Sequence, residues 1–138
     1  MTLSGPETNR PLELVREIYT AWEAGDFRSA AWAHPEIEYV QNDGLLGDAT
    51  RGVPAMTEAF RDWLRAWDGW RVEADDYLSL DDERVLVPFH FSARGRASGL
   101  EVGQIWTEGA TLFHVRDGRV TRLVQYLKRE RALVELGL

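Results

Sequence analysis

The residue best suited to acid–base chemistry is His90, which lies between Phe89 and Phe91 in a segment that alternates polar and apolar residues. Histidine gains and loses a proton near neutral pH, and burial beside two rings would favour the neutral imidazole that a general base needs. We therefore interpret His90 as a candidate catalytic base. Two alternatives stay open: a histidine on the outer face of a sheet, or one that is hydrogen-bonded in the core.

Glu108 is the second candidate catalytic residue, and its placement follows from a hairpin. The turn Arg-Asp-Gly-Arg at 116–119 suits positive φ angles, so Val115 should pair with Val120. Strict pairing then places on one face the pairs Leu112–Leu123, Ala110–Gln125 and Glu108–Leu127. A carboxyl group among such apolar neighbours would hold its proton more tightly, as an acid–base group must. The alternative is an exposed glutamate at a strand end.

Aromatic and polar side chains could surround such a site as the lining of a pocket. The chain contains six Trp, four Tyr and five Phe, and rings at this density either fill a core or line a cavity. Tyrosine hydroxyls can also orient a ligand. The candidate substrate-binding residues are Tyr19, Trp22, Tyr39, Asn42, Trp63, Trp106, Leu112, Leu123 and Gln125.

Composition argues against several other kinds of site. The formal net charge of −7 disfavours nucleic acid or an anionic membrane as the partner. The chain has no cysteine, its three histidines are scattered, and it lacks a phosphate-binding glycine motif, so we expect neither a metal nor a cofactor. No apolar run has membrane-spanning length and no signal peptide is recognisable, so a cytoplasmic protein is expected.

The elements that must position these residues follow from the spacing of apolar side chains. Helical spacing predicts helices over 11–24, 27–33 and 53–67, and a short one over 129–136. Alternation predicts strands over 36–41, 70–80, 85–95, 101–115 and 120–127, with a loop over 42–52. Helices followed by strands predict a single α+β domain over 11–138, in which a curved antiparallel sheet wraps over three helices. Residues 1–10 are predicted to be a flexible tail.

Four stretches, taken in order, resemble the NTF2-like superfamily and, within it, the SnoaL-like and ketosteroid isomerase-like proteins. They are AWEAGDF at 21–27, HPEIEY at 34–39, RGVPAM at 51–56 and FHVRDGRVTRLVQYLKRERAL at 113–133. The resemblance implies a cone-shaped domain with an apolar pocket between the concave sheet face and the helices. It also implies a homodimer that packs through the outer sheet face.

The resemblance to ketosteroid isomerase implies positions for a helix tyrosine, a base and an acid. The tyrosine would fall at or beside Ile18, with Tyr19 facing elsewhere. The base would fall at Tyr39 or Val40, and the acid near Thr111. The acid–base set of that enzyme is therefore not retained.

Two other relatives imply different sites. Limonene epoxide hydrolase implies Tyr39 and Asn42, but Gln125 stands where that enzyme has an aspartate, and a neutral amide is a poor base. SnoaL-type cyclases imply a histidine in the pocket, for which His90 is the candidate.

These observations predict a SnoaL-like protein that binds a small, mostly apolar molecule of polyketide-, terpenoid- or steroid-like kind. If it is an enzyme, it would be a cofactor-free isomerase, cyclase, dehydratase or hydrolase. The alternative is a non-catalytic ligand-binding or dimeric interaction domain.

Overall fold

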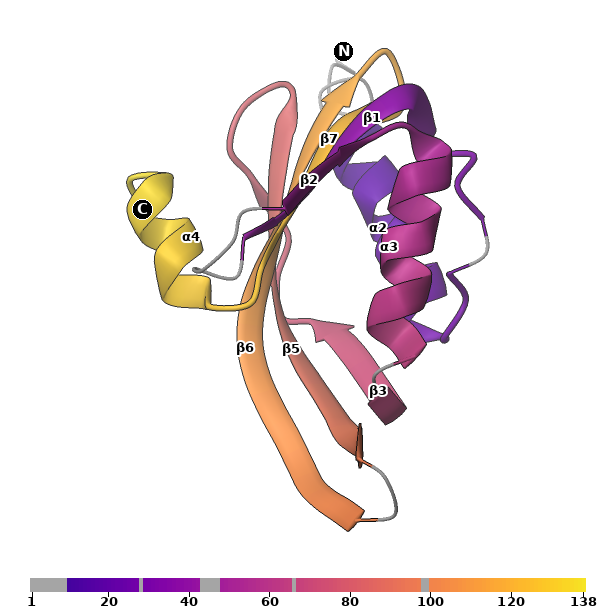
Figure 1. Ribbon diagram of the computed structural model, residues 1–138. Coiled ribbons are helices and arrows are strands. Elements are labelled where there is room, and N and C mark those ends of the chain that lie inside the picture. Colours follow the sequence, from indigo (N-terminus) through magenta and orange to yellow (C-terminus); the bar gives the residue numbers. More distant parts are fainter. Residues whose placement is uncertain (1–9, 28, 43–47, 66, 98–99) are drawn as a thin grey trace.

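The computed structural model describes residues 10–27, 29–42, 48–65, 67–97 and 100–138. Its elements, in chain order, are α2 (Arg10–Glu23), β1 (Ala33–Asn42), β2 (Asp48–Arg51), α3 (Val53–Arg65), β3 (Trp67–Ala74), β4 (Leu78–Ser79), β5 (Arg84–Ala97), β6 (Leu100–Arg116), β7 (Arg119–Tyr126) and α4 (Arg129–Glu135). Helices α2 and α3 lie on one face of a curved sheet, and α4 lies on the other (Figure 1). The predicted α+β architecture is therefore confirmed.

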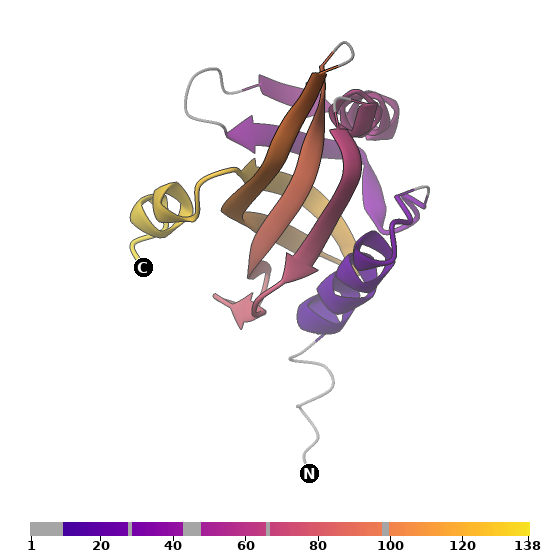
Figure 2. The ribbon, with the colours of Figure 1, turned by 90° about the horizontal axis from the view of Figure 1, so that it is seen from below.

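The sheet has the strand order β2-β1-β7-β6-β5-β3, and the short β4 also pairs with β5. The strands pair antiparallel except for β1 and β7, which run parallel. A parallel pair requires a long crossover connection, and here most of the chain lies between the two strands. The sheet is therefore mixed rather than wholly antiparallel, and Figure 2 shows its strong curvature from below.

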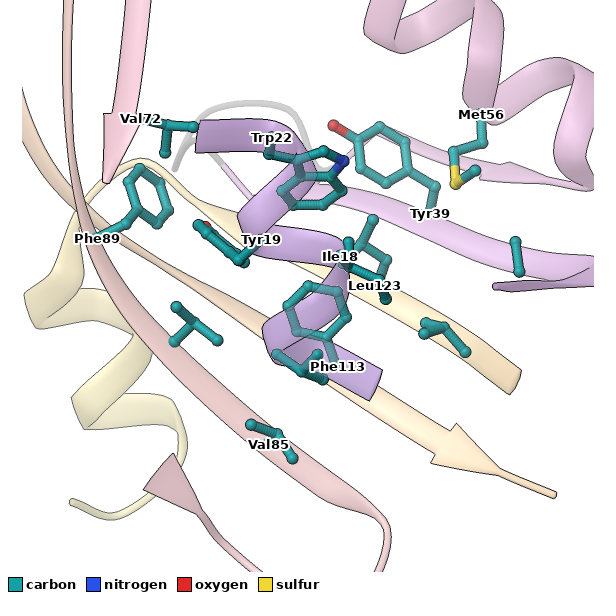
Figure 3. Close-up of a cluster of buried hydrophobic side chains, with 14 of the residues drawn as sticks. Ile18, Tyr19, Trp22, Tyr39, Met56, Val72, Val85, Phe89, Phe113 and Leu123 are labelled. Carbon is teal, nitrogen blue, oxygen red and sulfur yellow. The ribbon is translucent and has the colours of Figure 1, made fainter. Parts of the chain in front are cut away.

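The main core fills the concave face of the sheet. Helix α2 contributes Val15, Ile18, Tyr19 and Trp22, which share one side of the helix and are at most 3% exposed. The sheet contributes the alternating residues Val85, Val87, Phe89 and Phe91, whose common direction was predicted correctly. Burying each such apolar side chain stabilises the fold by roughly 1.5–3 kcal/mol. Figure 3 shows several of these side chains meeting between α2, α3 and the sheet.

A second apolar cluster lies on the outer face of the sheet. Leu86, Leu112, Val124 and Tyr126 project from β5, β6 and β7, and Ala132 of α4 packs against them. The predicted final helix therefore exists, and it covers the convex face. Both faces of the central strands are buried as a result, which explains why apolar residues occupy consecutive positions there.

The pairing of β6 with β7 contains a β-bulge, and this corrects the predicted register. Val115 pairs with Val120 as expected, but His114 pairs with Arg122, so Thr121 is an extra residue in β7. The Thr121 hydroxyl donates to the His114 carbonyl oxygen at 3.3 Å. Beyond the bulge the true pairs are Phe113–Leu123, Leu112–Val124, Thr111–Gln125 and Ala110–Tyr126. One extra residue reverses the facing of every later pair.

The predicted helix over 27–33 is wrong for the described residues, because the chain is held by the sheet instead. The carbonyl oxygen of Trp32 accepts a hydrogen bond from the Val120 amide at 2.8 Å. Ala33 already pairs with Val120 as the first residue of β1. Backbone groups used in this way cannot also complete a helical turn.

Two other boundaries differ from the sequence prediction. Part of the predicted loop over 42–52 forms β2, whose Arg51 pairs with Glu38 of β1, and α3 ends at Arg65 because β3 begins at Trp67. The strand predicted over 70–80 is divided into β3 and β4. The division follows from Asp76, whose carboxylate accepts a bond from the Tyr77 amide at 2.8 Å and favours a turn.

Candidate functional site

A chain of hydrogen bonds crosses the concave face from α2 to the centre of the sheet. The Tyr19 hydroxyl lies 2.8 Å from Thr111 Oγ1, and Thr111 Oγ1 donates to Gln125 Oε1 at 2.7 Å. A threonine hydroxyl carries a single hydrogen, so Tyr19 must be the donor to Thr111. In this chain Tyr19 therefore donates to Thr111, and Thr111 donates to Gln125.

Tyr19 is held as a neutral hydrogen-bond donor. Burial raises its pKa far above the ordinary value for tyrosine, and this outweighs the hydrogen bond to Thr111, which acts to lower it. The negative charges of Glu23 and Asp75 add to the increase. A phenol in this setting does not ionise under physiological conditions, so it can polarise a neighbouring group but cannot act as a base.

A hydrogen-bonded pair on β1, Tyr39 and Gln41, lies beside this chain. Tyr39 is buried against Phe60 of α3, with ring centroids 4.9 Å apart and planes at 90°. Gln41 Nε2 donates to the Tyr39 hydroxyl at 3.2 Å. Burial raises the pKa of Tyr39 despite the bond from Gln41, so this tyrosine also stays protonated.

The chain that begins at Tyr19 and the pair that begins at Tyr39 each end at a glutamine, and these two glutamines are adjacent. Gln41 and Gln125 are neighbours across the parallel β1–β7 pairing, and both side chains are only partly buried, whereas Thr111 is fully buried. Both strands are interior strands of the sheet. A side chain of an interior strand is reached only through the face from which it projects, so the concave face is accessible at this position.

Aromatic rings pack into an apolar cluster next to these groups. The Trp22 ring contacts Phe27 in a stacked arrangement at 5.6 Å, Phe60 at 5.7 Å and Phe113 at 5.9 Å. Tyr19 lies 5.0 Å from Trp22. Figure 3 shows Trp22, Tyr19 and Phe113 grouped together, with Tyr39 approaching from β1.

The structure brings together part of the substrate-binding set predicted from sequence. Tyr19, Trp22, Tyr39 and Leu123 lie in the main core, and Gln125 bonds to Thr111 beside them. Leu112 lies instead in the outer cluster under α4, because the β7 bulge reverses the predicted facing. The side chains of Asn42, Trp63 and Trp106 lie outside the part of the chain that the structure describes.

His90 and Glu108 are neighbours, as cross-strand partners of β5 and β6. His90 alternates with the core residues Phe89 and Phe91, so it projects from the outer face, where its side chain is 32% exposed. Glu108 is 74% exposed. Their roles as base and acid stay a prediction, and both side chains lie on the opposite side of the sheet from Tyr19 and Gln125.

An ionic cluster surrounds His90 on this outer face. His90 Nδ1 lies 2.7 Å from Asp75 Oδ1, and Nε2 lies 3.4 Å from Glu73 Oε2. Arg129 of α4 donates to Asp75 Oδ2 at 2.5 Å. Partial burial acts to raise the pKa of Asp75, but the bonds from Arg129 and His90 outweigh it, and the pKa falls below its ordinary value. The cluster fastens the start of α4 to the sheet.

Thr111 and Gln41 are site residues that the sequence prediction did not include. Gln41 could have been found, because it lies two residues after Tyr39 and so shares its face. Thr111 was noted only because the acid of ketosteroid isomerase would fall near it. Tyr19 was expected to face away from the position of that enzyme's helix tyrosine. Helix α2 buries Tyr19 and Ile18 together, and Tyr19 reaches Thr111.

Neither a metal site nor a membrane span is found in the described part of the chain. No three His, Asp or Glu side chains there are arranged to hold a metal ion. No helix within those residues is long and apolar enough to cross a membrane.

The curved sheet, the two inner helices and the aromatic interior define an NTF2-like α+β cone. A family model, the SnoaL-like domain, matches residues 15–123, so the chain belongs to the SnoaL-like domain family. A search among curated proteins gives no significant match.

Solved structures of low sequence identity share the fold. An NTF2-like protein from Burkholderia thailandensis is 19% identical with a TM-score of 0.75, over 91% of this chain and 96% of that one. A proposed polyketide cyclase from Xanthomonas campestris pv. campestris is 19% identical with a TM-score of 0.70, over 94% and 98%. TerC, co-crystallised with polyporic acid, is 20% identical with a TM-score of 0.71, over 92% and 97%. At these identities the comparisons establish the fold alone.

Proposed function

We propose that this protein binds a small, neutral, mostly apolar molecule of polyketide-, terpenoid- or steroid-like kind on the concave face of its sheet. The observation that carries the proposal is the ordered chain from Tyr19 through Thr111 to Gln125. It places hydrogen-bonding groups beside a cluster of aromatic rings and ends at a partly accessible amide. A mostly apolar surface with a few convergent polar groups is typical of small-molecule sites.

The hydrogen-bonded polar groups named above favour a neutral ligand over an anionic one. They are two protonated tyrosines, one threonine and two amides, namely Tyr19, Tyr39, Thr111, Gln41 and Gln125. None of these groups carries a charge, so a carboxylate or phosphate would lose its hydration without gaining a counter-charge. A ketone, lactone or quinone would lose much less.

Catalysis is the finer part of the proposal. Tyr19 donates its proton to Thr111, whereas the Tyr39 hydroxyl accepts from Gln41. The Tyr39 hydroxyl could therefore polarise a bound carbonyl, which supports isomerisation, cyclisation or dehydration, but neither tyrosine can remove a proton. His90 and Glu108 are the residues that we propose as base and acid, and a substrate using them would bind on the outer face beside the Asp75 cluster. Simple binding without turnover is the alternative, and it is favoured by the absence of a carboxylate or imidazole from the five concave-face groups named above.

A ligand screen tests the binding proposal. We expect apolar ketones and lactones to raise the melting temperature, and to quench tryptophan fluorescence because Trp22 lies in the aromatic cluster. A Trp22→Leu variant should weaken binding, whereas Val134→Ser, which changes an exposed side chain on α4, should not. No stabilisation by any compound would contradict the proposal.

Turnover is tested with His90→Ala and Glu108→Gln. A bound compound whose conversion slows in both variants would support the acid–base roles, and conversion at an unchanged rate would contradict them. We further propose one domain over 11–138, a cytoplasmic location and a homodimer through the outer sheet face, in which α4 would form part of the interface. Light scattering after gel filtration measures the oligomeric state.

A further inference from the structure

The two glutamines at the accessible part of the concave face each have one amide atom engaged by the protein. Gln41 uses Nε2 to donate to Tyr39, and Gln125 uses Oε1 to accept from Thr111. An amide side chain has a donor end and an acceptor end. The ends directed to a ligand are therefore Gln41 Oε1, an acceptor, and Gln125 Nε2, a donor.

The two glutamines that carry these ends are neighbours in the sheet. Gln41 and Gln125 are Cα partners in the parallel β1–β7 pairing, and paired strands lie about 4.8 Å apart. Among the described residues, neither end has a hydrogen-bond partner, and the two amides are not bonded to each other. Both side chains are partly accessible, so a ligand can approach the donor and the acceptor together.

We infer that the Gln41–Gln125 pair recognises a neutral group with a hydrogen-bond donor and acceptor side by side, such as the edge of a lactam or of an enolised 1,3-dicarbonyl. The ligand's N–H or O–H donates to Gln41 Oε1, and its carbonyl accepts from Gln125 Nε2. This rests on the proposed function, because it names the polar group of the molecule that the concave face would bind.

The protein fixes the order of donor and acceptor. Thr111 donates its single proton to Gln125 Oε1, and so it accepts the proton of Tyr19. The buried phenol keeps its proton, so the chain cannot reverse by ionisation of Tyr19. Gln125 therefore offers an N–H to the ligand, and a ligand that places two acceptors there leaves Gln41 Oε1 without a donor.

The experiment compares three bicyclic ligands of similar size by titration calorimetry: 2-quinolone, N-methyl-2-quinolone and naphthalene. Methylation removes the donor of the lactam edge but keeps its carbonyl. We expect the wild-type protein to bind 2-quinolone about tenfold more tightly than its N-methyl analogue, the value for one lost hydrogen bond of about 1.4 kcal/mol.

Two matched variants assign the preference to the glutamines. Gln41→Met removes the acceptor for the ligand's N–H, so the preference for 2-quinolone over its N-methyl analogue should fall to about twofold or less. Gln125→Glu keeps the acceptor for Thr111 but removes the donor to the carbonyl that both quinolones carry, so both should bind more weakly and the preference should persist. If Gln41→Met does not fold, Gln41→Leu replaces it, with folding checked by circular dichroism.

Equal binding of the two quinolones by the wild type, or a preference that survives in Gln41→Met, would overturn the inference. If naphthalene binds as tightly as both quinolones, the apolar concave site stands and only the paired recognition fails. If none of the three compounds binds, the proposed function fails together with it.

Discussion

Replacing Thr111 with valine would interrupt the hydrogen-bond chain at its centre. Valine has nearly the same shape as threonine, and Thr111 is fully buried, so packing changes little. The hydroxyl of Tyr19, a residue that is only 1% exposed, would lose its acceptor without gaining water. An unsatisfied buried hydroxyl costs about 1–3 kcal/mol, so we expect Thr111→Val to lower the free energy of unfolding by about 2 kcal/mol.

The partner variants make the prediction specific. Tyr19→Phe alone removes one bond but leaves Thr111 donating to Gln125, so it should cost about 1 kcal/mol. In the double variant no hydroxyl is left unsatisfied, and it should be about 1 kcal/mol more stable than Thr111→Val alone. The second substitution would therefore restore stability that the first removes.

Urea unfolding measures these differences, with the fluorescence of the six tryptophans as the signal. Equal m-values across the four proteins would show that the free energies are comparable. A double variant that is at least as unstable as Thr111→Val would refute the reasoning, because the two hydroxyls would then act independently.

Other predictions concern packing and titration. Gly109→Ala should destabilise the protein by about 2 kcal/mol, measured by thermal melting. The reason is that an added Cβ would lie 2.4 Å from the Tyr126 carbonyl oxygen and 2.6 Å from Phe89 Cζ. An unchanged melting temperature would contradict this prediction. Burial acts to raise the pKa of Asp75, but Arg129 and His90 lower it below its ordinary value. The ionised carboxylate therefore stabilises the fold above about pH 4, and this stabilisation is lost as the pH falls further. Asp75→Asn should weaken that acid dependence in urea titrations at about pH 2–7, and Asp82→Asn is the control. Burial, together with Glu135, raises the pKa of Tyr126 to about 12, so the fold loses stability as the pH rises from about 10 to about 12. Tyr126→Phe should weaken this loss in urea titrations over that range, and an equal loss in the variant would contradict the prediction.

The sequence predicted most elements because local periodicity determines them. The alternation at 85–95 correctly separated Phe89 and Phe91 from His90, since successive side chains of a strand project to opposite faces. It could not determine which face meets α2, and so the outer position of His90 stayed one of several alternatives. That choice depends on packing between segments far apart in the chain.

The register of the final hairpin shows a second limit. The turn and the Val115–Val120 pair were predicted correctly, and the error began at Thr121, one residue later. No residue type marks that bulge: Thr121 is a favourable strand residue. The bulge places Leu123 and Gln125 towards the core and leaves Val124 and Tyr126 for α4. This register is selected because it buries apolar side chains of β7 on both faces of the sheet at once.

The bulge at Thr121 also has a consequence for how such a protein can change during evolution. Alternate residues of β7 after the bulge form two sets of side chains, one for each face of the sheet. Whether the number of residues between the turn and this segment is odd or even determines which set lines the interior. Loss of the single extra residue would exchange the two sets without altering any other amino acid. A one-codon deletion could therefore replace the whole chemical lining contributed by β7, a larger step than any point substitution offers. When functional residues are transferred between relatives of this family, alignment across the bulge decides which side of the sheet they belong to.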